Sequence, residues 1–162
     1  MDIFNESLTI DTTEKIDFID VTDDVRNIVS KLNIKEGLVN LFTTHTTTAI
    51  RINENEPRLI EDLKFFLEKH CPKYGKYFHD DIEERDVNEE EPKNAHSHLK
   101  SFILGTSESI PIINSELRLG QWQSIFFVDL DGPRRRNLSV NILGVKNGYK
   151  ANSKKAQRKN RR

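Results

Sequence analysis

The chain has 162 residues, of which 35% are hydrophobic and 31% charged. This length is enough to form one domain without disulfides, and the single cysteine, Cys71, excludes an intrachain disulfide and a cysteine-based zinc site. No apolar run approaches the roughly 20 residues that span a membrane, and the N-terminus lacks the pattern of a signal peptide. We therefore expect a cytoplasmic protein with no membrane partner.

Charge is divided unevenly along the chain. Residues 146–162 contain eight Lys or Arg and no acid; without them 17 basic and 26 acidic residues remain, a net charge of −9. We expect one domain over residues 1–143 and a basic, flexible C-terminal tail over residues 144–162. A basic tail can contact nucleic acid, but a solubilising end is the interpretation we favour.

The N-terminal third predicts a β-hairpin and a helix. Apolar and polar residues alternate over residues 5–20, with Asp11-Thr12-Thr13 as a turn between two strands. Residues 21–32 then carry apolar side chains at helical spacing, and Thr22 is the expected cap of this helix.

A buried strand and a second helix follow. Residues 37–52 are rich in apolar residues and threonine, which predicts β-structure. Pro57 marks the start of a helix that ends at His70, with Asn55 or Glu56 as its cap.

Residues 72–95 are irregular, with eight acids between Asp80 and Glu91, which predicts a solvated loop of the length often used as a lid. From His96 onward the pattern is β-rich, and strands are expected over residues 98–104, 109–113, 116–120, 122–130 and 137–143, with Asn114-Ser115 as a hairpin turn. The predicted fold class is α+β, with antiparallel sheets in a jelly-roll-like sandwich and two main helices on one side.

Histidines form the first chemical signal. On a strand, His96 and His98 would project from the same face, about 6–7 Å apart. His45 lies at the end of another predicted strand. Three imidazoles can bind zinc, and nearby carboxylates would favour magnesium. We therefore predict a divalent-metal site formed by His45, His96 and His98, although a His-x-His sequence also arises by chance.

A second signal points to phosphate. Threonines flank His45, and their hydroxyls can hold phosphate oxygens, although threonine also simply favours strands. Arg134-Arg135-Arg136 follows a Gly-Pro turn, and alternation along the following strand directs Arg134 and Arg136 to one face and Arg135 to the other. Guanidinium groups match phosphate geometry; an exposed basic turn is the alternative. On the predicted strand, Lys100 shares a face with the two histidines. The predicted phosphate-binding residues are Thr46, Thr47, Lys100, Arg134 and Arg136.

Several motifs occur along the chain in an order that is typical of one family. They are His45-Thr46-Thr47-Thr48-Ala49, Asn53-Glu54-Asn55, His79-Asp80, Asn94-Ala95-His96-Ser97-His98-Leu99-Lys100-Ser101, Leu104-Gly105-Thr106-Ser107, Gly120-Gln121-Trp122-Gln123 and Gly132-Pro133-Arg134-Arg135-Arg136. Over residues 5–143 the chain resembles the YjbQ-type family, named secondary thiamine-phosphate synthase. The resemblance implies a compact α+β subunit assembled as a homotrimer. It also implies a catalytic pocket with His45, Asn53, Glu54, Asp80 and His98.

The implied reaction joins hydroxymethylpyrimidine diphosphate to thiazole phosphate and releases pyrophosphate, as a weak or secondary activity. A divalent metal, magnesium or zinc, together with Arg and Lys would neutralise the leaving diphosphate. Two alternatives stay open from the residues themselves. One is a metal-dependent hydrolase of a phosphate ester, and the other is a non-catalytic protein that binds a small phosphorylated metabolite, or RNA through its tail.

Overall fold

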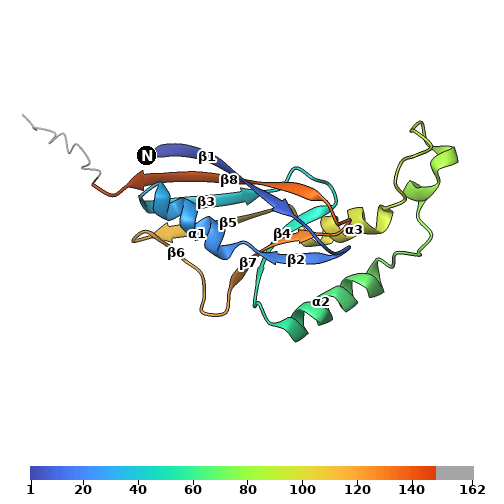
Figure 1. The fold of residues 1–162 in the computed structure, drawn as a ribbon, viewed down its shortest axis with the longest axis horizontal. Helices are drawn as coiled ribbons and strands as arrows, with labels where there is room; N and C mark the ends of the chain where they lie inside the picture. Colours follow the sequence, from blue (N-terminus) through green and yellow to red (C-terminus); the bar gives the residue numbers. More distant parts are fainter. Residues whose placement is uncertain (149–162) are drawn as a thin grey trace, which may run out of the picture.

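Two antiparallel sheets form the body of the protein, which we describe from a computed structural model over residues 1–148 (Figure 1). The five-stranded sheet contains, in spatial order, β1 (Asp2–Asp11), β8 (Arg135–Lys146), β3 (Ile34–Phe42), β5 (Ser107–Ile113) and β6 (Glu116–Leu117). The three-stranded sheet contains β2 (Asp17–Asp20), β7 (Ser124–Asp129) and β4 (Thr48–Asn53). The helices are α1 (Thr22–Lys31), α2 (Pro57–His70) and α3 (Ala95–Leu104), with short 3-10 turns η1 (Phe78–Asp80) and η2 (Ile82–Glu84). The α+β sandwich is thus confirmed, with three helices where two were predicted.

Strand β7 lies at the centre of the packing because both of its faces are buried. Ile125 and Phe127 join the main core between the two sheets, together with side chains of β3, β5 and β8. Phe126 and Val128 point the other way and pack with Leu67 of α2. Each such buried side chain stabilises the fold by about 1.5–3 kcal/mol. The mostly apolar sequence of this strand follows from its burial on both sides.

The predicted hairpin over residues 5–20 is wrong, because its two strands belong to different sheets. β1 pairs with β8, and β2 pairs with β7. Thr12 fixes the crossing: its N–H donates to the Arg134 carbonyl at 3.0 Å, and its hydroxyl donates to Asp129 at 2.8 Å. A buried threonine, rather than a tight turn, therefore directs the chain from one sheet to the other.

The predicted strand over residues 98–104 is also wrong, because this segment is helix α3. Ser97 and Ser101, four residues apart, lie on one helical face and donate to the carbonyls of Leu130 and Thr48. Of the apolar residues that suggested a buried strand, Phe102 and Ile103 are 87% and 50% exposed, whereas Leu104 packs against the smaller core cluster. Two buried hydroxyls thus attach α3 to the end of β7 and to β4.

One of the two predicted helix caps is confirmed and the other is wrong. Glu56 caps α2, as predicted, by accepting hydrogen bonds from the backbone N–H groups of Arg58 at 2.9 Å and Leu59 at 2.7 Å. Thr22 does not cap α1, since it is the first helical residue and its hydroxyl donates to Asp20. The same hydroxyl accepts the N–H of Ile125, so Thr22 connects α1 to β7 instead.

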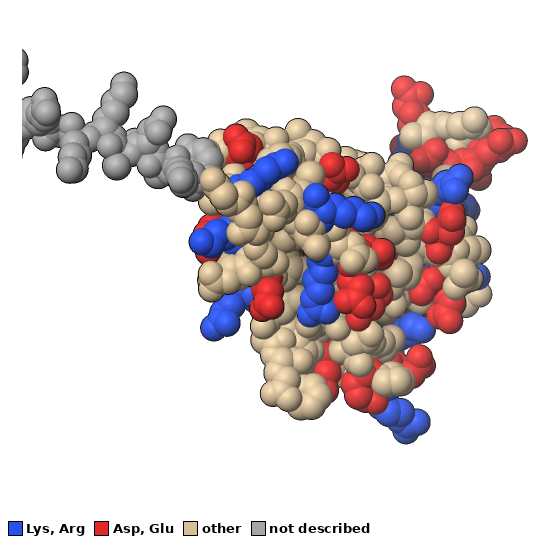
Figure 2. All heavy atoms as spheres, turned by 60° about the vertical axis from the view of Figure 1, so that its left-hand side comes forward, with Lys and Arg blue, Asp and Glu red and all other residues tan. Residues whose placement is uncertain are grey.

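Two ends of the molecule differ in character. The segment that holds η1 and η2 projects from the body in Figure 1, and Figure 2 shows acidic side chains gathered on it. β8 continues to Lys146, beyond the predicted domain end at residue 143, and the predicted tail from residue 149 onward lies outside the described residues. Within residues 1–148, no helix has the length and apolar character that crossing a membrane requires.

Candidate functional site

The threonine-rich connection between β3 and β4 is held in shape by two of its own hydroxyls. Thr43 and Thr48 share a buried hydrogen bond of 2.6 Å, and the Thr48 hydroxyl also lies 3.2 Å from the His45 carbonyl. Both are buried, whereas Thr44 and Thr46 are exposed. The dense threonines therefore serve different purposes: Thr43 and Thr48 close the loop, Thr44 and Thr46 lie on its outer side, and buried Thr47 faces inward.

This loop forms one wall of a cavity of about 320 Å³. The N-terminal part of α3 forms a second wall, and the turn that leads into β8 forms a third. We call this cavity the histidine–arginine pocket. Its lining residues are Thr44, His45, Thr46, Thr47, Glu91, Pro92, Asn94, His98, Asp131, Arg134 and Arg136.

Arg136 is fixed beneath the pocket by a buried carboxylate. Its Nε and Nη2 donate to the two oxygens of Asp129 at 2.9 and 2.7 Å, and both side chains are almost fully buried. Nη2 also lies 3.3 Å from the Thr47 hydroxyl. Burial alone would raise the pKa of Asp129, but hydrogen bonds from Arg136, the Asp131 backbone and Thr12 lower it. The pair is therefore ionised, and Nη1 has no acceptor within residues 1–148.

Arg134 lies at the mouth of the pocket. Its guanidinium is 3.0 Å from Asp131, whose same oxygen accepts a hydrogen bond from Asn94 at 2.9 Å. Arg135 instead pairs with Asp11 at 3.2 Å, and both of these side chains are more than two-thirds exposed. The alternation predicted for the three arginines is confirmed, since only Arg134 and Arg136 line the pocket.

His45 faces this arginine pair as a neutral ring. Its Nε2 accepts the backbone N–H of Asn137 at 3.2 Å, which leaves the proton on Nδ1. Burial, and next the positive charge of Arg136, lower the pKa of His45 below 6.5, although Asp129 opposes this shift. At neutral pH His45 is therefore an uncharged hydrogen-bonding group.

His98 enters the pocket from α3. Its ring stacks on His79 with centroids 4.8 Å apart. Burial, followed by the neighbouring His79, lowers the pKa of His98, so this ring is also neutral at pH 7. Asp80 does not line the pocket; it lies 3.4 Å from His79 and accepts the Ala95 N–H at 3.0 Å. The predicted catalytic Asp80 thus lies at the N-terminus of the helix that carries His98.

His96 and Lys100 lie on another side of α3. Residues two apart on a helix point in nearly opposite directions, whereas residues four apart share a face. The expectation that Lys100 shares a face with both histidines is therefore wrong, since it shares one with His96 alone. Both line a different cavity from His98. Within residues 1–148, no three His, Cys, Asp or Glu side chains are grouped so as to hold a metal ion.

Asn53 and Glu54 lie at the other end of β4. Thr48 begins this strand beside the pocket and Asn53 ends it, so the two are about 16 Å apart along the strand. Both residues are exposed, and Asn53 accepts the backbone N–H of Glu54 at 2.9 Å. Within one chain they do not reach the histidine–arginine pocket.

Comparison with known proteins agrees with this architecture. The family described as UPF0047 protein YjbQ-like matches residues 6–145. The chain belongs to the YjbQ-like UPF0047 family. UPF0047 proteins of Methanothermobacter thermautotrophicus and Archaeoglobus fulgidus are 39% and 42% identical to it. These alignments cover 89% and 84% of this chain, and 94% and 98% of the relatives.

Solved structures give the same result for the fold. A YbjQ-like protein from Sulfolobus solfataricus P2 superposes with a TM-score of 0.81 at 34% identity, covering 89% of this chain and 99% of that one. A hypothetical protein from Aeropyrum pernix K1 has a TM-score of 0.78 at 37% identity, with 88% and 99% coverage. The YjbQ-like fold is therefore shown over nearly all described residues.

In this YjbQ-like chain, three residues that position the arginines of the pocket were missed in the sequence. Asp129 and Asp131 end an apolar strand and directly precede the Gly-Pro turn, a position that could have marked them as partners of the arginines. Asn94 belongs to a recognised motif but was assigned no role. It matters because its amide holds Asp131 in place beside Arg134.

Proposed function

We propose that the histidine–arginine pocket binds a phosphorylated metabolite and carries a transferase reaction of the thiamine-phosphate-synthase type. The observation that supports this most strongly is the arrangement of two neutral imidazoles, His45 and His98, around two guanidinium groups. Arginine is suited to phosphate because it offers several N–H donors in a plane and stays charged. Neutral imidazoles add donors without repelling a metal-bound or basic substrate.

The diphosphate of hydroxymethylpyrimidine diphosphate is the group this pocket would hold. Arg134 supplies a charge at the mouth, and Nη1 of Arg136 supplies donors from below. The hydroxyls of Thr46 and Thr47 lie on the adjoining loop. Because Asp129 fixes Arg136, its guanidinium is positioned before substrate binds, which is the arrangement that stabilises developing charge most effectively.

In this proposal the carbon–oxygen bond to the diphosphate breaks, and pyrophosphate departs with the bonding electron pair. The thiazole nitrogen then donates its lone pair to the pyrimidine methylene carbon, forming the new carbon–nitrogen bond. No proton has to be removed from the nitrogen. The chain's own residues therefore need to bind and orient the two substrates and stabilise the leaving group, rather than act as strong acids or bases.

The predicted zinc or magnesium site does not fit the described residues. His45, His96 and His98 cannot share one ion, since α3 directs His96 away from the other two. Asp131, a carboxylate of the pocket lining, is already bound by Arg134 and Asn94. We therefore assign no step to a metal held by the protein, and magnesium enters the assay as the counterion of the diphosphate substrate.

We also propose that the chain assembles as a homotrimer through the outer face of the five-stranded sheet. Three rows of side chains cross β1, β8, β3 and β5 on this face, and none is charged in a protein with 31% charged residues. The rows are Ile3, Leu143, Leu38 and Pro111, then Asn5, Asn141, Asn40 and Ser109, then Ser7, Ser139, Phe42 and Ser107. Leu38 and Phe42 are each 40% exposed there. The central parts of protein interfaces are similarly depleted of charge.

A trimer would also give Asn53 and Glu54 a role. They lie too far from the pocket of their own chain, so in this proposal a neighbouring subunit supplies them. Mixing His98→Ala with Glu54→Ala chains tests the point, because exchange of subunits would rebuild some complete pockets. We expect activity to return in the mixture, and mixed trimers that stay inactive would contradict the shared pocket.

The transferase proposal is tested by incubating the purified chain with both precursors and magnesium and measuring thiamine phosphate. We expect product from the wild type, at least 100-fold less from His98→Ala, and unchanged product from His70→Ala, whose histidine is exposed on α2. Absence of product from the wild type would reject the transferase. Turnover of generic phosphate esters that depends on His98 would favour the hydrolase instead.

Assembly is tested by sedimentation of the 18.9 kDa chain. We expect a trimer for the wild type and a monomer for Leu38→Lys combined with Asn40→Lys, because these place two like charges in the interface. A wild type that sediments as a monomer at micromolar concentration would overturn the trimer.

A further inference from the structure

A second cavity, of about 280 Å³, lies on the other side of α3 from His98. Its size is close to the lower end for small-molecule sites, about 300 Å³. The walls are formed by the segment just before β2, the end of α2 with the loop beyond it, α3, and the turn after β7. We call it the lysine cavity. Its lining residues are Lys15, Ile16, Glu68, Lys73, Tyr74, Lys93, His96, Lys100, Leu130, Asp131 and Gly132.

Lys100 is the most unusual residue of this cavity, since it is only 1% exposed. Its ammonium contacts one oxygen of Glu68 at 2.8 Å, and the other oxygen of Glu68 accepts the Lys73 backbone N–H at 2.7 Å. A buried lysine is costly unless it is paired. The cavity therefore contains a charged side chain that the fold holds in place, rather than a flexible surface lysine.

The charges around the cavity do not balance. Glu68 is occupied by Lys100, and Asp131 by Arg134 and Asn94. Within residues 1–148, no carboxylate lies within 4.0 Å of the ammonium groups of the other three lysines, which are Lys15, Lys73 and Lys93. Lys73 lies close enough to Lys15 to lower the pKa of Lys15. An anion between the two would remove this repulsion.

His96 provides an independent observation. It is 9% exposed, it lines the cavity, and its buried Nδ1 has no hydrogen-bond partner within the described residues. Burial, and then the charge of Lys100, lower the pKa of His96, so the ring is neutral at pH 7 and carries one N–H donor. Buried polar atoms are rarely left without a partner in native proteins.

We propose that the lysine cavity is a second anion site, which binds the phosphate group of a small phosphate monoester or inorganic phosphate itself. Lys15 and Lys73 would close on the phosphate from the rim, with Lys93 beside them. Lys100 and His96 would contact it from within. The proposal does not depend on the transferase reaction, because α3 separates this cavity from the histidine–arginine pocket and only Asp131 lines both.

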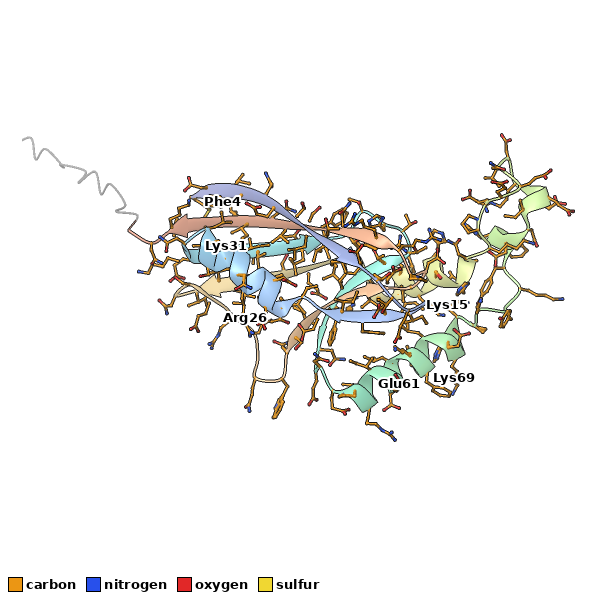
Figure 3. The ribbon with its side chains drawn as sticks, viewed as in Figure 1. Phe4, Lys15, Arg26, Lys31, Glu61 and Lys69 are labelled. Atoms are coloured by element: carbon orange, nitrogen blue, oxygen red, sulfur yellow. The ribbon has the colours of Figure 1, made fainter. Side chains whose placement is uncertain are left out.

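The test is a calorimetric titration of the full-length protein with inorganic phosphate at pH 7.5 and constant ionic strength. Lys15→Gln combined with Lys73→Gln should weaken binding at least tenfold, and His96→Leu should weaken it as well. Lys31→Gln combined with Lys69→Gln is the matched control, because it removes the same charge from exposed positions on α1 and α2. Figure 3 shows Lys15 near the end of α2 and Lys31 on α1, on the other side of the molecule.

Arg134→Gln distinguishes the two cavities. We expect the Arg134→Gln protein to bind phosphate, and we expect this binding to weaken when Lys15→Gln and Lys73→Gln are added. Phosphate binding lost in Arg134→Gln but unchanged in the double lysine variant would place the anion in the histidine–arginine pocket and overturn this site alone. The lysine cavity is also rejected if the wild type binds no phosphate at 10 mM, about the weakest affinity a useful metabolite site would have. A titration with glycerol phosphate then distinguishes a monoester site, which binds it as well as phosphate, from a site for free phosphate.

Discussion

The two sides of helix α3 present similar residues to different surroundings. His98 faces the histidine–arginine pocket, where Asp129 fixes Arg136 and Asp131 holds Arg134. His96 faces the lysine cavity, where three lysines lack a carboxylate partner within residues 1–148. Burial lowers the pKa of both rings. The opposite sides of one helix thus face two kinds of site, a rigid set of donors on the His98 side and, on the His96 side, a set that an anion would have to organise.

The ion pairs on the two sides of α3 also differ in how strongly they stabilise the fold. In the histidine–arginine pocket, the positive charge is neutralised by a fully buried carboxylate, whereas in the lysine cavity the buried Lys100 depends on Glu68, whose side chain is 47% exposed. Solvent screens the second pair more than the first. Removing the carboxylate should therefore cost more on the His98 side than on the His96 side.

Asp129→Ala should have the largest effect on folding. It leaves the Arg136 guanidinium buried without its partner, which should lower the free energy of unfolding by about 3–5 kcal/mol in urea denaturation. Asp11→Ala is the control, since it breaks the exposed pair with Arg135 and should cost less than about 1 kcal/mol. An equal loss of unfolding free energy from the two substitutions would contradict the view that the Asp129–Arg136 pair contributes more because it is buried.

Glu68→Ala should have an intermediate effect. Lys100 loses its carboxylate and the Lys73 backbone N–H loses its acceptor, so we expect a loss of about 1–2 kcal/mol by the same measurement. Glu61→Ala, which removes a 71% exposed acid from the same helix, should change stability by less than about 0.5 kcal/mol. A loss from Glu68→Ala as large as that from Asp129→Ala would contradict the difference between the two sides of α3.

The smallest expected effect is on the pH dependence of stability. His45, His96 and His98 have pKa values below their ordinary 6.5, because the folded protein favours their neutral forms. Below pH 6.5 the unfolded chain therefore binds protons that the folded chain does not, and the free energy of unfolding falls as pH decreases through this window. Denaturation at pH 7.5 and 5.5 should show this fall, and His98→Gln should reduce it. Stability that rises on acidification across the same window would contradict the neutral rings.

Much of the fold could be predicted from local pattern. Alternation identified most strands, Pro57 and Glu56 marked the start of α2, and Asn114-Ser115 was expected as a turn; both of these turn residues have positive φ, as a tight hairpin requires. α3 was missed because Phe102-Ile103-Leu104 looks like a buried strand. Its inward face is formed mainly by polar residues such as Ser97 and Ser101, with Leu104 as its apolar end, so the apolar residues alone did not reveal the helix.

Those parts of the site that depend on residues adjacent in the sequence could be predicted. Those that depend on contacts between distant segments of the chain could not. The alternation of Arg134 and Arg136 needed only neighbouring residues. Asp129 joins Arg136 across a turn, and α3 meets the loop at His45 only through tertiary packing. The charge-free sheet face likewise emerges when β1, β8, β3 and β5 are placed in register, because each strand alone contributes only a few uncharged residues.

Phosphate binding in the histidine–arginine pocket is tested most directly by long-range ¹H–¹⁵N NMR. The ring nitrogens of the five histidines are observed while pyrophosphate is added at pH 7.5. We predict that His45 and His98 start as neutral rings, that both shift saturably with pyrophosphate, and that the exposed His70 does not move. His45 and His98 that stay unchanged at saturating pyrophosphate, or that are already imidazolium without it, would contradict a phosphate-binding histidine–arginine pocket.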